Sequence, residues 1–125
     1  MDLNRCMDCR KGRVKIRRKY PVLHDIFGIK LTVLDRVYVC ERCNAVTIGW
    51  HRVAGHGIRL DRAYRAAIQA PTGKEIRKRR KALGLTRAAL AEAVGVTEDK
   101  IASWERGVIF SPEDNARLKQ ALKLA

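Results

Sequence analysis

The sequence predicts an α+β fold, in which a small β-rich domain with a connecting helix (residues 1–70) precedes an all-α domain (residues 71–125). Two observations predict this division. The first half holds runs of β-branched and aromatic residues with partial alternation, whereas the second half holds helical segments that each follow a capping residue. A third observation, two Cys-x2-Cys pairs in the first half, indicates how so small a β-rich unit could be stable.

Three strands are predicted in the first half, over residues 14–22, 29–39 and 45–50. The segment HRVAGHG, residues 51–57, is broken by glycines and is predicted to be a loop. Small and apolar residues then recur at helical spacing over residues 58–70, which predicts the connecting helix. The interruption APTG follows and marks the domain boundary.

Four helices are predicted in the second half, each opened by a residue whose hydroxyl can cap the first turn. Glycines end the first three, because glycine readily adopts the left-handed conformation that closes a helix. The opening residues are Thr72, Thr86, Thr97 and Ser111, and the closing residues are Gly84, Gly95 and Gly107.

The four cysteines are expected to bind one structural Zn²⁺ ion. Cys6 and Cys9 precede the first strand, and Cys40 and Cys43 follow the second. An antiparallel strand pair would bring both Cys-x2-Cys turns to the same end, as in a zinc ribbon, and four thiolates would complete a tetrahedral shell. A domain of this size gains much of its stability from such a metal.

Other uses of the cysteines remain open at this stage. A redox pair would need a βαβ context, which neither pair has, and a disulfide framework is disfavoured in the cytoplasm, where the chain is expected to reside. Another metal is a further alternative. His24, His51 and His56 are possible substitute ligands, but each is expected to be an ordinary surface or loop histidine.

The charge of the chain indicates polyanionic partners. The formal net charge is +14, divided into +9 for residues 1–70 and +5 for residues 71–125. Nucleic acid is the first candidate and an anionic membrane surface the second. No apolar run is long enough to span a membrane, and the first residues do not resemble a signal peptide. On a strand, one face would carry Arg13, Lys15, Arg17 and Lys19, and the other, core-facing side would carry Val14 and Ile16.

The stretch from Leu85 to Trp104 has the pattern of two short helices that share a core and cross steeply. Gly95 supplies the tight turn between the helices, and the small Ala91 permits their close crossing. The predicted core positions are Leu85, Leu90, Val94, Val96, Ile101 and Trp104. A helix-turn-helix explains this pattern better than a purely structural helical bundle, which stays the alternative.

The run GLTRAALAEAVGVTEDKIASWERG, residues 84–107, resembles the lambda-repressor-like (Xre) helix-turn-helix family, and the resemblance covers roughly residues 72–124. Arg87 stands where that family often has glutamine. With the cysteine module in front, the whole chain resembles MqsA-type antitoxins, which carry a YgiT-type zinc finger. This resemblance implies that the N-terminal domain binds a ribonuclease toxin, and that the C-terminal domain dimerises and represses its operon. The resemblance to the Xre family also implies a structural ion pair between Arg80 and Glu105.

The third helix of the second half, Thr97 to Arg106, is the expected recognition helix, since the N-terminal part of such a helix meets base edges in the major groove. Ile101 and Trp104 are expected to face the core. Thr86 and Arg87 open the preceding helix, where phosphate contacts are common. The expected DNA-binding residues are Thr86, Arg87, Thr97, Glu98, Asp99, Lys100, Ser103 and Arg106.

The resulting hypothesis is a sequence-specific transcriptional regulator that binds double-stranded operator DNA, acts as a dimeric repressor and is the antitoxin of a type II operon. One alternative is a stand-alone phage or plasmid regulator whose basic zinc domain adds DNA contacts. Another is an RNA-binding zinc-ribbon protein. An enzyme is not expected, because the sequence has two serines, no suggestive carboxylate pair and no phosphate-binding glycine loop.

Overall fold

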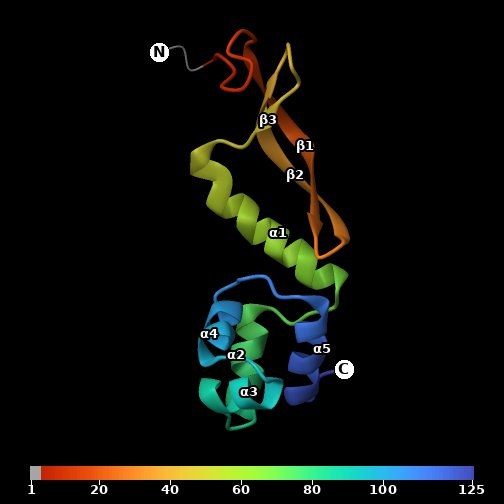
Figure 1. Cartoon of the computed structure of the whole chain (residues 1–125), viewed down its shortest axis with the longest axis vertical. Coiled ribbons are helices and arrows are strands. Elements are labelled where there is room, and N and C mark those ends of the chain that lie inside the picture. Colours follow the sequence, from red (N-terminus) through yellow and green to blue (C-terminus); the bar gives the residue numbers. More distant parts are fainter. Residues whose placement is uncertain (1–3) are drawn as a thin grey trace.

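A computed structural model describes residues 4–125 of the chain. Three parts follow one another along its long axis (Figure 1). A cysteine lobe, residues 4–50, contains the sheet; the helix α1 (Val53–Ala67) lies across it; and a helical domain, residues 71–125, lies at the other end. The α+β class predicted from the sequence is confirmed. Among the described residues, no helix is both long and apolar enough to cross a membrane.

The sheet of the cysteine lobe is a long antiparallel hairpin with a short third strand. Strand β1 (Val14–Ile26) pairs with β2 (Ile29–Cys40) from Val14 opposite Cys40 to Ile26 opposite Ile29, and β3 (Val46–Thr47) pairs with the other edge of β2. Helix α1 covers one face of the hairpin (Figure 1). The third strand is therefore shorter than predicted, while β1 runs four residues further.

A bulge interrupts β1 in its most basic segment. The register shifts between Arg17 and Tyr20, and Lys19 has a positive φ of 51°. The predicted alternation of cations along residues 13–19 is therefore wrong beyond Arg17, because a bulge re-aims the side chains that follow it. Ile16, expected on the core side, is 47% exposed.

The predicted loop over residues 51–57 is wrong. A 3-10 turn, η1 (Trp50–Arg52), leads directly into α1, which begins at Val53 and ends at Ala67. Glycine disfavours helix by about 1 kcal/mol, but contacts with the sheet outweigh that preference here. The buried residues of α1 are His56, Tyr64 and Arg65, whereas the apolar Ile58 is 55% exposed.

The helical domain follows the prediction closely. Its helices are α2 (Gly73–Ala82), α3 (Arg87–Val94), α4 (Glu98–Glu105) and α5 (Pro112–Ala121), and the predicted threonines and serine accept a backbone hydrogen bond in each first turn. Gly95 adopts the left-handed conformation that the turn between α3 and α4 requires, with a φ of 87°. The core residues are Ile76, Leu90, Ala91, Val94, Ile101, Trp104, Phe110, Leu118 and Leu122.

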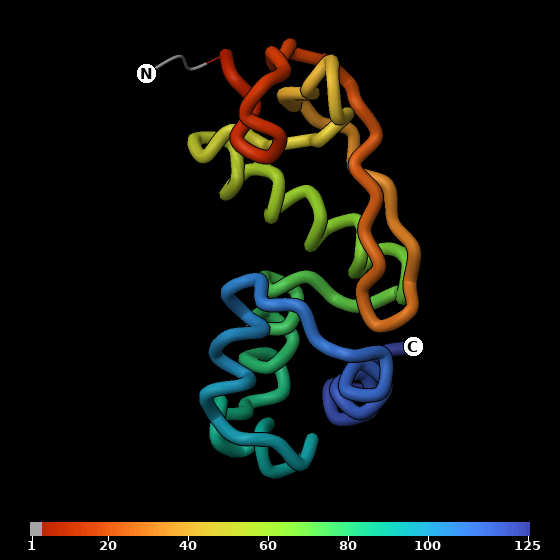
Figure 2. Tube along the Cα trace, turned by 45° about the horizontal axis from the view of Figure 1, so that its top comes forward, coloured from red at the N-terminus to blue at the C-terminus, as the bar shows by residue number. Residues whose placement is uncertain are grey.

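The last turns of α1 contact the helical domain as well as the hairpin. Tyr64 is fully buried, and its hydroxyl donates a 2.7 Å hydrogen bond to the carbonyl of Phe110. The side chain of Asn115 donates to the carbonyl of Ile68 at 3.0 Å. The tube in Figure 2 shows the segment after α1 running directly beside the start of α2 and the α4–α5 connection.

Candidate metal centre and nucleic-acid interface

The structure brings all four cysteine sulfurs together. Cys6 and Cys9 lie in the loop before β1, Cys40 ends β2, and Cys43 lies in the turn that follows. The Sγ atoms all lie within 4.8 Å of one another, and both the Cys6–Cys43 and the Cys9–Cys40 pairs are 3.7 Å apart. The pairing of Val14 with Cys40 is what places the two turns at one end of the hairpin.

This arrangement fits a tetrahedral metal ion. With Zn–S bonds of about 2.3 Å, the sulfurs of a regular tetrahedron lie about 3.8 Å apart, which is close to the observed pairs. The backbone amides of Gly12 and Arg42 each donate to a sulfur, Cys9 Sγ and Cys40 Sγ respectively, at 3.3 Å. A Cβ atom at Gly12 would collide with Cys40 Sγ, so only glycine fits beside the cluster. The four cysteines can therefore bind a metal ion such as zinc.

The four thiols differ in acidity. Backbone hydrogen bonds from Lys11 and Gly12 lower the pKa of Cys9 to about 6, against an ordinary value near 9. The Ala45 amide lowers the pKa of Cys43, but burial and hydrogen bonds with the other three thiols outweigh it and raise that pKa to about 11. Crowded sulfurs of this kind hold protons in common, and a divalent cation can take the place of those protons.

The surface of α4 carries half of the predicted DNA-binding residues. Ile101 and Trp104 are buried, as expected, so the opposite side of the helix is left to solvent. Glu98, Asp99 and Lys100 are exposed there. The partly buried Ser103 donates from its hydroxyl to the carbonyl of Lys100 at 2.8 Å.

The two predicted threonines of the interface are helix caps. The hydroxyl oxygen of Thr86 accepts from the amide of Ala89 at 3.0 Å, and that of Thr97 accepts from the amide of Lys100 at 3.3 Å. Their exposed positions leave the hydroxyl hydrogens able to donate outward. Arg106, also exposed, caps the other end of α4.

The C-terminal end of α4 is held by ion pairs. Glu105 Oε2 lies 3.2 Å from Arg80 Nε of α2, and both side chains are more than nine-tenths buried. Arg87, expected only at the DNA surface, also has its Nε 3.5 Å from the same oxygen. One carboxylate thus links α2, α3 and α4.

A buried ionic cluster that the sequence reasoning missed joins β2 to α1. The Asp35 side chain is fully buried and accepts hydrogen bonds from Arg52 Nη2 at 3.0 Å, from His56 Nδ1 at 2.7 Å and from Arg59. Arg52, His56 and Arg59 are spaced so that they share one helix face. Burial would raise the pKa of Asp35, but the hydrogen bonds from His56, Arg52, the Arg36 amide and Arg59 outweigh it and hold that pKa well below its usual range.

Two histidines extend this cluster onto β1. His24 Nε2 and His56 Nε2 are 2.8 Å apart, so one ring must donate and the other accept. Because His56 Nδ1 faces Asp35, a neutral His56 can accept at Nε2 from His24. Burial, and then the proximity of His56, lowers the pKa of His24. The expectation that His56 is an ordinary surface or loop histidine is therefore wrong, since it is 5% exposed.

Acidification is expected to destabilise the attachment of β1 to α1. The folded state holds His24 with a lowered pKa, so the unfolded chain binds the proton first as pH falls through about 6.5. Stability is present above that range and is lost below it. Urea unfolding of the metal-loaded protein, monitored by amide exchange in β1, should show this loss of stability between about pH 7.5 and 5.5.

The test variant is His24→Gln. Its matched control is His51→Gln, which changes an exposed histidine. Metal release from the cysteines also grows on acidification, but it would affect both variants equally. His24→Gln should flatten the pH dependence of β1, and His51→Gln should not. An identical pH profile in the wild type and His24→Gln would contradict the assignment.

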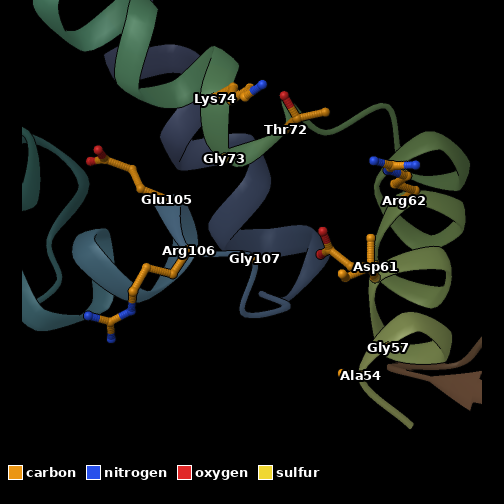
Figure 3. A pocket seen from close by; sticks show the side chains of 11 residues that line it. Ala54, Gly57, Asp61, Arg62, Thr72, Gly73, Lys74, Glu105, Arg106 and Gly107 are labelled. Atoms are coloured by element: carbon orange, nitrogen blue, oxygen red, sulfur yellow. The ribbon is translucent and has the colours of Figure 1, made fainter. Parts of the chain in front are cut away.

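A groove of about 540 Å³ separates α1 from the helical domain. Asp61 and Arg62 line it from α1, and Lys74, Glu105 and Arg106 line it from the other side (Figure 3). Cations and carboxylates are mixed along its walls, so it has no single charge preference.

Comparison with known proteins identifies one part of the chain. Residues 73–125 match the model of a family described as "Helix-turn-helix domain". The match supports the Xre-like assignment of the C-terminal region and covers less than half of the chain. None of the curated proteins compared with the chain matches it. The helix-turn-helix domain indicates a DNA-binding regulator of transcription, and the clustered cysteines indicate a metal site beside it.

Proposed function

We propose that the protein is a sequence-specific DNA-binding repressor of transcription that uses α4 as its recognition helix. The observation that carries the proposal is the fixed presentation of α4. Ile101 and Trp104 anchor one side of the helix in the core, and the polar residues of the other side are left exposed within a segment that matches a helix-turn-helix family. Such a helix fits the major groove.

The residues divide into two proposed roles. Thr86, Arg87, Thr97 and Arg106 would contact phosphate through hydroxyl, amide or guanidinium donors, which fix the register of the protein on the duplex. Lys100 and Ser103 would read base edges as donors, whereas Glu98 and Asp99 would accept from cytosine amino groups. The two carboxylates also stabilise α4 electrostatically, because they lie at the positive, N-terminal end of its helix dipole.

We further propose that Cys6, Cys9, Cys40 and Cys43 hold one structural zinc ion in each chain. Four thiolates leave no open coordination position, so the ion would supply folding energy and no catalysis. In regulation, the ion would stabilise the hairpin against which α1 packs.

The antitoxin role is a finer proposal and rests on the resemblance to MqsA-type antitoxins in domain order and cysteine spacing. A hairpin face that could meet a ribonuclease toxin is available, since Leu23, Phe27 and Leu34 are 77%, 61% and 57% exposed. Homodimerisation is proposed on the same resemblance. Co-expression with the product of an adjacent small gene, followed by gel filtration, tests the toxin complex, and loss of the complex in Leu23→Asp would locate it on this face.

A second candidate activity is direct contact of the cysteine lobe with nucleic acid. Exposed cations surround the cysteines, while the exposed acids of the described lobe are Asp8 and Glu41 near the cysteines and Asp25 far along the hairpin. These cations could neutralise phosphates beside the site that α4 reads. They are Arg5, Arg10, Lys11, Arg13, Lys15, Arg17, Arg18, Lys19 and Arg42.

One binding experiment tests both ideas. The wild-type protein should select a defined sequence from a randomised duplex pool, and the affinity for that duplex should fall as salt rises. Lys100→Ala or Ser103→Ala should reduce discrimination between the selected and a scrambled duplex by roughly 1–3 kcal/mol for each base that the variant no longer reads. Failure of the wild type to enrich any sequence would reject the proposed function.

The salt dependence separates the cysteine lobe from α4. If Arg17 and Arg18 contact phosphate, alanine at both should reduce the slope of log affinity against log salt by about 0.9 per phosphate contact, with discrimination unchanged. Lys30→Ala, at an exposed lysine near the far end of the hairpin, is the control. An unchanged slope in the double variant would exclude lobe contacts by these residues.

A further inference from the structure

Arg65 of α1 is almost completely buried, with 1% of the residue exposed, and its guanidinium is directed into the helical domain. Its Nε pairs with Asp61 at 2.8 Å within α1. Its Nη1 donates to the carbonyl of Pro71 at 2.8 Å, just before α2 begins. Its Nη2 donates to the carbonyls of Trp104 and Val108, at 2.9 and 3.2 Å.

These acceptors lie at the end of the proposed recognition helix and in the connection that follows it. Trp104 belongs to the last turn of α4, and the carbonyl of Phe110, in the same connection, accepts from Tyr64. The guanidinium also lies 4.8 Å from the centre of the Phe110 ring, within the range of a cation–π contact. Tyr64 and Arg65, which are adjacent in α1, therefore donate hydrogen bonds to three backbone carbonyls of residues 104–110.

The end of α4 is thus held by arginines from three helices. Arg80 of α2 and Arg87 of α3 pair with Glu105, and Arg65 of α1 bonds the carbonyl of the preceding residue. The first two lie within the segment that matches the helix-turn-helix family, whereas Arg65 lies before it. The family segment alone lacks one of the three anchors of its recognition helix.

We infer that Arg65 is a positioning residue for DNA reading, and that the DNA-binding unit of this protein extends from α1 to the C-terminus. The inference rests on the proposed function, because it assumes that α4 reads the operator. Arg65 itself is buried and contacts no DNA. It acts by fixing the carbonyl end of α4, so its removal should lower discrimination between sequences while leaving the number of phosphate contacts unchanged.

The test uses full-length protein, the duplex selected by the wild type and a scrambled duplex of equal length. Arg65→Met removes the donors and keeps much of the volume, and Arg65→Lys keeps the charge but cannot reach all three carbonyls. Arg65→Met should bind the selected duplex about tenfold or more weakly, as expected when charge-assisted hydrogen bonds are removed. Its affinity for the scrambled duplex and its salt slope should stay unchanged, and amide exchange over residues 104–110 should accelerate.

Arg62→Met is the matched control, because it removes an exposed arginine from the same helix. It should keep the discrimination ratio. If Arg65→Met does not fold, Arg65→Lys and Tyr64→Phe decide, with smaller losses of discrimination expected in both. Wild-type discrimination in folded Arg65→Met, or in both milder variants, would overturn the inference and leave the proposed function standing. A wild type that selects no sequence would reject the proposed function instead.

Discussion

Replacing Cys40 with serine is expected to unfold the cysteine lobe while the helical domain stays folded. Cys40 is fully buried, its Sγ accepts two backbone amides, and it contacts Cys9. Serine would not supply a thiolate, and structural zinc contributes about 10 kcal/mol or more to folding. Amide exchange should show loss of protection in β1 and β2, and elemental analysis should show zinc in the wild type but not in the variant.

Arg42→Ala is the control for Cys40→Ser, because it changes an exposed neighbour that carries no sulfur. It should keep both the metal and the protection of the hairpin. Chelation of the wild type should reproduce the Cys40→Ser pattern and expose the thiols to a colorimetric reagent. A hairpin that keeps full protection in the metal-free protein would contradict the structural role of zinc.

Replacing Glu105 with alanine is expected to cause the largest loss of stability in the helical domain. The variant leaves Arg80 buried beside no carboxylate, and breaking a buried ion pair in this way destabilises proteins by about 3–5 kcal/mol. Arg80 keeps its 2.9 Å hydrogen bond to the carbonyl of Leu85, so its charge stays fixed in the buried position. Denaturant unfolding monitored by the buried Trp104 should report the loss.

Two further variants make the Glu105 result specific. Glu105→Gln should be less damaging, because an amide oxygen can still accept from Arg80. Glu92→Ala, at an exposed glutamate of α3, should stay within about 0.5 kcal/mol of the wild type. Equal stability of Glu105→Ala and Glu92→Ala would show that the pair contributes nothing.

The sequence predicted the helical domain well because each helix carries its own boundary signals. The caps Thr72, Thr86, Thr97 and Ser111 act through contacts within three residues, so they can be read without knowledge of the fold. The cysteine cluster was equally readable, because metal geometry restricts the spacing of the ligands.

The remaining features depend on partners distant in sequence. Asp35 interrupts an apolar strand, and Arg52, His56 and Arg59 recur at helical spacing, but nothing local connects the two patterns. The contacts of Asp35 with these three residues stabilise α1 despite Gly55 and Gly57, which had favoured the prediction of a loop. A lone acid in an apolar strand was the signal available, and it indicates a buried cationic partner.

The position of Arg65 could not be predicted from the sequence for a similar reason. It is one of several arginines on a helix that was predicted as a connection between domains. Its acceptors are backbone carbonyls, which every residue has, so the sequence does not indicate which residues accept. The same limit applies to the second role of Arg87, since its distance from Glu105 depends on the crossing of α3 and α4.

The attachment of α1 to both neighbours restricts how this protein can be recombined with others. A chimera joined at Pro71 would remove the donors of Tyr64 and Arg65 and leave the carbonyls of Trp104, Val108 and Phe110 without them. The Trp104 carbonyl would keep its bond from the Gly107 amide, whereas the Phe110 carbonyl would lose the Tyr64 donor. A buried acceptor left without a partner costs about 1–3 kcal/mol. A junction ahead of Val53 would keep those donors but would separate Asp35 from His56 and Arg59. The exchangeable module for engineered regulators is therefore α1 together with the helical domain, grafted with a replacement for Asp35.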